Sequence, residues 1–233
     1  MTKTENHWNS KALILLGMWL WEQGEYGHAL LCMHGPHWGL KIGTQLKISW
    51  YDVINTEDTG FTVVSFYIPG KDEAVREINY SVSDNIITAY HTLPVEYIDD
   101  SMYMNYKTGN PLTSSTLNRE LQRFSEKFLD DIKVKTGIKL NFKPLKTNAF
   151  EIAWALDMVK KYSYSKLVFS AVSKTMGHRT VKDTIELLEV APIDNIEISY
   201  DLIEDIPPMI GSGIFDDEEK LKNFVSRQAR YGL

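Results

Sequence analysis

Cysteine is almost missing from this sequence, because Cys32 is the one cysteine in 233 residues. A disulfide framework within the chain is therefore excluded, and a reducing, cytoplasmic compartment is predicted. The first ten residues carry no basic cluster ahead of an apolar run, so we predict no secretory signal. The apolar run at 12–21 ends at Glu22 and is too short to span a bilayer. It predicts a core helix and no membrane partner.

An excess of positive charge is also missing. The formal net charge is −6, which is not typical of a nucleic-acid-binding protein. The acidic excess is concentrated from Asn195 onward, where eight acidic side chains accompany four basic ones. The rest of the chain is therefore close to neutral and could still present a basic face. The hydrophobic content of 43% is enough for a packed core, which argues against disorder over most of the chain.

The spacing of apolar residues predicts a mainly helical α+β chain with a small antiparallel sheet. Two β-rich runs, at 61–68 and 74–79, predict a hairpin. The composition changes beyond Pro192, so we expect one domain at 1–190 and an acidic C-terminal arm and helix at 191–233. The predicted helices cover 11–22, Tyr26 to just before Gly35, 40–48, Ser83 towards Pro94, a long stretch from Thr113 or Ser114, 148–160, 167–172 after a cap at Ser163 or Ser165, 181–188 and 215–230.

The stretch at 176–188, MGHRTVKDTIELL, combines a turn with an amphipathic helix. Gly177 suits a turn because it lacks a Cβ atom, and Thr180 can cap the helix that follows. His178 is the residue of this turn that could carry chemistry. Leu187, nine residues later, is most simply explained as a packed leucine, and it can do no chemistry.

Three stretches with a loop between them occur in a characteristic order. They are 39–53 (GLKIGTQLKISWYDV), 140–146 (LNFKPLK) and 176–184 (MGHRTVKDT), with the loop 105–113 (NYKTGNPLT) ahead of the long helix. Together they resemble the boxes of the catalytic domain of tyrosine recombinases, the phage integrase family. The resemblance covers about residues 10–190 and implies the fold of that domain, mainly helical with a small antiparallel sheet.

The resemblance also implies a chemistry that this chain lacks. In the family, a tyrosine attacks a DNA phosphorus, and two arginines help to hold the phosphate oxygens. Leu187 stands at the tyrosine position, and Lys41 and Lys146 stand at the arginine positions. A covalent step needs a nucleophile, and the planar guanidinium of arginine meets two oxygens where lysine offers a point charge. We therefore predict no catalytic residue and no strand cleavage.

The replacements keep positive charge, which predicts that duplex DNA is bound without being cut. Each neutralised phosphate would add a salt-dependent increment to the affinity. The alternative without a DNA-binding role is that these lysines are unselected surface residues. The predicted DNA-binding residues are the three box lysines, a hairpin lysine and the histidine of the turn: Lys41, Lys71, Lys143, Lys146 and His178.

This set of residues predicts an inactive, recombinase-like DNA-binding protein, such as a repressor or accessory factor of a phage or mobile element. One alternative is an active recombinase in which Tyr200 or Tyr231 replaces the missing nucleophile. Another is a protein-interaction scaffold, which the charge of −6 favours. An oligomer through the C-terminal segment is left open. The histidines and cysteine at 28–37 match no zinc signature, so we predict no metal and no cofactor.

Overall fold

The computed structural model describes residues 6–54, 62–66, 74–78, 80–97, 99–190, 192 and 209–231. Its elements in chain order are α1 (Ser10–Glu22), α2 (Tyr26–Trp38), α3 (Ile42–Gln45), α4 (Trp50–Ile54), β1 (Thr62–Phe66), β2 (Ala74–Ile78), α5 (Tyr80–Thr92), β3 (Met104–Asn105), β4 (Asn110–Pro111), α6 (Ser114–Thr136), α7 (Ala149–Lys161), α8 (Lys166–Met176), α9 (Val181–Leu188) and α10 (Glu218–Tyr231).

The strands form two small antiparallel sheets, β1 with β2 and β3 with β4. In the first, Thr62 is opposite Ile78 and Phe66 is opposite Ala74, which confirms the predicted hairpin. The second closes within the predicted loop at 105–113, where Asn105 pairs with Asn110. The mainly helical α+β class is therefore confirmed.

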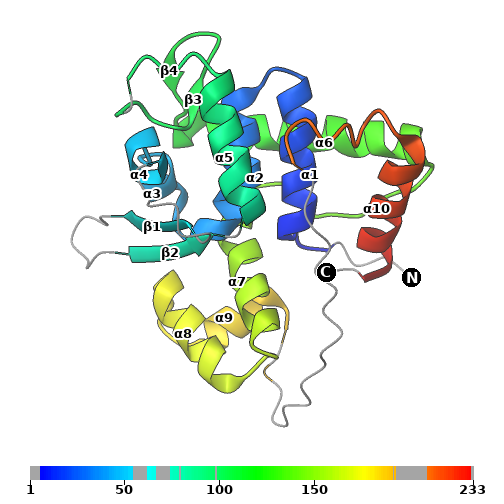
Figure 1. Ribbon diagram of the computed structural model, residues 1–233. Coiled ribbons are helices and arrows are strands. Elements are labelled where there is room, and N and C mark those ends of the chain that lie inside the picture. Colours follow the sequence, from blue (N-terminus) through cyan, green and yellow to red (C-terminus); the bar gives the residue numbers. More distant parts are fainter. Residues whose placement is uncertain are drawn as a thin grey trace.

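The main core lies between α1, α2, α5, α6 and the first turn of α7 (Figure 1). Helices α1 and α2 approach closely at Gly17, where an added Cβ would lie 2.5 Å from Cγ of Met33 and 2.8 Å from the carbonyl oxygen of Ala29. Leu221 and Val225 of α10 are fully buried in the same core. The last helix is therefore packed into the body of the chain, whereas the predicted domain boundary at residue 190 stays a prediction.

A second core joins α7, α8 and α9, which lie together at one end of the molecule (Figure 1). Trp154 and Val159 of α7 pack there with Phe169 of α8 and Leu188 of α9. The two cores meet at Gly39, which ends α2 in the left-handed conformation at φ 58°. An added Cβ at Gly39 would lie 2.4 Å from the ring of Trp154, so only glycine allows this contact.

Several predicted helix boundaries were wrong, including the end of α8, which lies at Met176 and not at 172, and the start of α10, which lies at Glu218 and not at 215. Helix α2 continues through Gly35 and Pro36 because its last turn is held in the core, where the Trp38 indole donates to the Tyr103 hydroxyl at 2.7 Å. The helix predicted over 40–48 is only the four-residue α3, since the Gln45 amide folds back and donates to the Leu40 carbonyl at 2.7 Å. Helix α5 begins three residues before the predicted cap at Ser83.

Candidate nucleic-acid interface

Lys41 is brought to the turn between α8 and α9. It is the residue before α3, and its side chain is exposed. Its ammonium nitrogen lies 4.0 Å from the position that a Cβ of Gly177 would occupy. Glu151 of α7 is also near: burial raises the pKa of this carboxyl, and the positive charge of Lys41 opposes the rise. Two of the predicted site positions, Lys41 and the turn that carries His178, therefore lie side by side.

The orientation of His178 is fixed by its own turn. Gly177 ends α8 with φ 73°, and the His178 backbone N–H donates to the Ser173 carbonyl at 2.9 Å. The imidazole Nδ1 then lies 2.8 Å from the hydroxyl of Thr184, which is fully buried in α9. This leaves the other ring nitrogen, Nε2, as the atom that could meet a ligand.

A capping box fixes the start of α9. The Thr180 hydroxyl accepts from the Asp183 backbone N–H at 3.2 Å, and the Asp183 carboxylate accepts from the Thr180 N–H at 2.9 Å. Hydrogen bonds that the carboxylate accepts from the Thr180 backbone and side chain lower the pKa of Asp183, with smaller contributions from the nearby His178 and Arg179. The predicted cap at Thr180 is confirmed, and it holds the turn in register with the helix.

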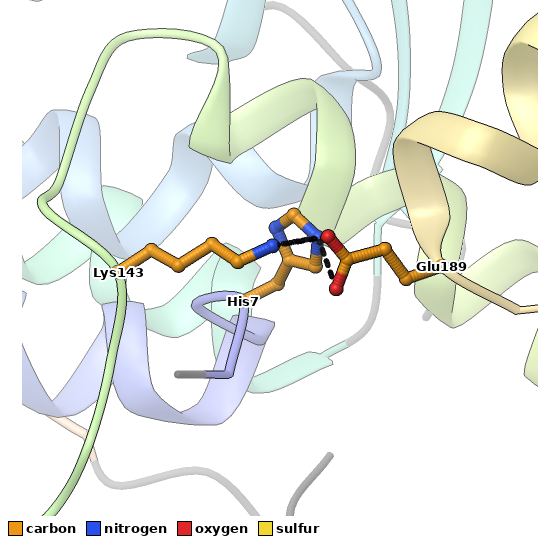
Figure 2. A network of polar contacts seen from close by, with 3 residues as sticks. All are labelled: His7, Lys143 and Glu189. Carbon is orange, nitrogen blue, oxygen red and sulfur yellow. Dashed lines mark hydrogen bonds and ion pairs between the residues drawn. The ribbon is translucent and has the colours of Figure 1, made fainter. Parts of the chain in front are cut away.

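Lys143 lies at the other end of α9, in contact with two residues that the sequence did not single out (Figure 2). Its ammonium donates to the Glu189 carboxylate at 2.5 Å and lies 3.0 Å from Nε2 of His7. His7 Nε2 is 3.6 Å from the second carboxylate oxygen. Burial and Lys143 lower the pKa of His7, against the effect of Glu189, so the neutral ring accepts a hydrogen bond from the lysine.

The N-terminal segment delivers His7 to this place. Asn6 forms a parallel bridge with Phe142: its N–H donates to the Asn141 carbonyl, and its carbonyl accepts from Lys143, both at 2.9 Å. The ring of Trp8 stacks on Phe142 with centroids 4.5 Å apart. No spacing in the sequence signals this contact, because 135 residues separate Trp8 from Lys143. His7 was missed for that reason.

Lys146 and Lys71 are the remaining predicted DNA-binding residues. Lys146 is exposed, just after the buried Leu145 and before α7 begins. Helix α9, about 12 Å long, lies between the turn of His178 and Glu189. The structure therefore puts Lys41 beside the turn of His178 and puts Lys143 in contact with His7 and Glu189. Lys71 lies outside the described residues.

Leu187 is half-buried and packs against the core of α7, α8 and α9. A hydrocarbon thus occupies the position at which the resemblance implies a nucleophile. Tyr200 lies outside the described residues, and for Tyr231 only the backbone at the end of α10 is described.

The histidines around Cys32 belong to the core. Nε2 of His28 lies 3.2 Å from the Glu120 carboxylate. Burial lowers the pKa of His34 to about 3 and that of His37 to about 4, and it raises that of the Cys32 thiol. Within the part of the chain that the structure describes, no three metal-binding side chains gather, and no helix is long and apolar enough to cross a membrane.

Comparison with solved structures identifies the fold of this chain. No protein-family model and no curated protein matches the sequence. Among solved structures, the chain is similar to XerH site-specific recombinase in a post-cleavage complex with palindromic difH substrate, at TM-score 0.50 and 14% identity over 78% of this chain and 49% of that chain. It is also similar to XerH in a pre-cleavage complex with difH substrate, at TM-score 0.50 and 13% identity over 79% and 51% of the two chains.

The chain has the fold of tyrosine recombinase catalytic domains. It spans about half the length of the two recombinase chains to which it is similar. The predicted fold is confirmed by this likeness. The five predicted DNA-binding residues stay a prediction, because a likeness at this level of identity extends to the backbone alone.

Proposed function

We propose that this chain binds duplex DNA with the surface formed by Lys41, Lys146, His178 and the Lys143 region, and that it does not cut the DNA. The observation that supports the proposal is the position of Lys41. Its ammonium lies beside the turn of His178, although 137 residues separate the two in the sequence. Two groups that can donate to phosphate oxygens thus converge within a recombinase-like fold.

The expected absence of cleavage rests on three replacements. Leu187 offers no hydroxyl and is packed among hydrocarbon side chains. Lys41 and Lys146 supply positive charge without the two-pronged geometry that stabilises a phosphoryl transition state. Binding needs only the charge, so these changes affect chemistry far more than affinity. A role as repressor or accessory factor of a phage or mobile element would use such binding.

A salt titration of duplex DNA binding tests the proposal. We expect binding that weakens steeply with salt, and we expect Lys41→Met and Lys146→Met each to reduce the slope of log affinity against log salt by about one. Lys127→Met serves as the control, because Lys127 is an exposed residue of α6, and this helix lies away from α8 and α9 (Figure 1). Absence of binding even at low salt would reject the proposal and favour a protein-interaction scaffold.

The alternative of an active recombinase has its own test. A nicked suicide duplex traps any covalent protein–DNA adduct. We expect no adduct with the natural chain. An adduct that disappears in Tyr200→Phe or Tyr231→Phe would establish a displaced nucleophile and overturn the inactive interpretation.

A further inference from the structure

The Lys143 ammonium already holds an anion that belongs to the protein. The Glu189 carboxylate directs one oxygen to the lysine at 2.5 Å and lies 3.6 Å from the His7 ring through the other. A carboxylate and a phosphate present the same feature to a lysine, namely oxygen acceptors that share a negative charge. Lys143 is one of the predicted DNA-binding residues, and in this structure its ammonium is paired with the Glu189 carboxylate instead of a phosphate.

The backbone directs Glu189 towards this contact. It follows α9 in the left-handed conformation at φ 58° and ψ 25°, and its N–H donates to the Ile185 carbonyl at 2.9 Å. Few residues other than glycine adopt this region. The conformation turns the chain at the end of α9, where the side chain meets Lys143 (Figure 2).

His7 holds the other side of the lysine. The neutral imidazole accepts from the ammonium at 3.0 Å, and the backbone bridge of Asn6 with Phe142 keeps the ring in place. Since His7 and Lys143 are fixed by the same bridge, the ammonium remains aimed at the same point when the carboxylate leaves. His7 is therefore a positioning residue for Lys143.

We propose that Glu189 is an internal substitute for a DNA phosphate: it occupies Lys143 in the free protein, and a backbone phosphate displaces it on binding. This inference rests on the proposed function and names a regulation of the same surface. The side chains of Lys143 and Glu189 are 32% and 53% exposed, so their pairing is weak enough for a polyanion to replace it. Glu189 therefore lowers the DNA affinity by competing with phosphate for Lys143, and this competition is called the brake below.

Glu189→Gln tests the brake, because it removes the charge and keeps the size of the side chain. Exposed ion pairs are worth about 0.2–1 kcal/mol, so we expect the variant to bind duplex DNA up to about fivefold more tightly. We expect its salt slope to match that of the wild type, because Lys143 meets a phosphate in both complexes and only the competing carboxylate is lost.

Glu186→Gln is the matched control. It removes the same charge three residues earlier, within α9, and also releases a lysine, because Glu186 pairs with Lys182 at 3.6 Å. A general effect of charge would act equally in both variants. We expect Glu186→Gln to gain less affinity and to keep the wild-type salt slope.

A double-mutant cycle assigns the effect to Lys143. Lys143→Met should cost little affinity in the wild type, where Glu189 competes for the lysine. It should cost up to about fivefold more in the Glu189→Gln background, where the lysine is free for phosphate. His7→Phe in the same background should reduce the gain, since the ammonium loses the acceptor that directs it.

The outcomes separate this inference from the proposed function. If the wild type binds DNA and Glu189→Gln gains no more affinity than Glu186→Gln, the brake is overturned and DNA binding stands. If neither the wild type nor Glu189→Gln binds at low salt, both fall. Binding by Glu189→Gln but not by the wild type supports both, with the brake stronger than an exposed pair suggests.

Discussion

At the scale of one residue, Leu187 stands at the position where the resemblance implies a nucleophile. It packs with its neighbours in the core of α7, α8 and α9. We expect Leu187→Tyr to form no adduct on a nicked suicide duplex, because Lys41 and Lys146 do not replace the arginine cradle. Each lost donor of this kind costs about 3 kcal/mol of transition-state stabilisation.

The triple variant Leu187→Tyr, Lys41→Arg, Lys146→Arg provides the comparison. It restores the nucleophile and both guanidinium groups, so it should form more adduct than Leu187→Tyr alone. Adduct formation by Leu187→Tyr alone would show that lysines suffice, and the account of inactivity would then be wrong. Circular dichroism of each variant would establish that its helices are intact.

Two histidines, the fully buried His34 and the half-buried His37, make stability depend on pH. The pKa of His34 falls to about 3 and that of His37 to about 4, because burial disfavours the charged ring. Between these values and 6.5 the unfolded chain binds protons that the folded chain does not. The free energy of unfolding should therefore decrease as the pH falls through this window, by about 1.4 kcal/mol per pH unit for each histidine.

His34→Leu should reduce this slope by about one proton, measured by urea unfolding between pH 7 and pH 5. Asp157, whose pKa burial raises to about 6, acts in the opposite sense. The comparison is therefore made between the variant and the wild type. His91→Gln, at an exposed residue, is the control. An unchanged slope in His34→Leu would contradict the assignment.

At the scale of elements, the capping box of α9 supports the turn that carries His178. Thr180→Ala removes the hydroxyl that accepts from Asp183 and should lower the free energy of unfolding by about 1 kcal/mol. Thr175→Ala is the control, because this exposed residue only donates to the Ala171 carbonyl within α8. It should change the stability by less than about 0.5 kcal/mol. Equal effects would show that the box contributes nothing measurable.

At the scale of the whole molecule, α10 closes the main core from the far end of the sequence. Leu221 is fully buried, so Leu221→Ala should cost about 2–4 kcal/mol in urea unfolding. Leu167→Ala, at a side chain that is 84% exposed, should cost almost nothing. The midpoint should not depend on protein concentration, because α10 packs on its own chain. A midpoint that rises with concentration would show that α10 docks on a second copy.

The sequence by itself determined most helices and the hairpin, because these depend on local signals. The local signals are the capping box of Thr180 and Asp183, the helix cap at Ser165 and the apolar spacing of α6. Each of them acts within a few residues. The sequence could not determine that α2 continues through Pro36, or that the helix predicted over 40–48 is interrupted. There, contacts with Tyr103 and the fold-back of Gln45 outweigh local preference.

For the candidate site, the sequence determined the residue types at the box positions, including the leucine at 187 and the lysines at 41, 143 and 146. Only the tertiary structure decided which of them meet. It put Lys41 beside Gly177 and gave Lys143 to His7 and Glu189. Charge partners lie across a surface and not along a chain, so an ammonium that the sequence counts as free is already bound to a carboxylate 46 residues away.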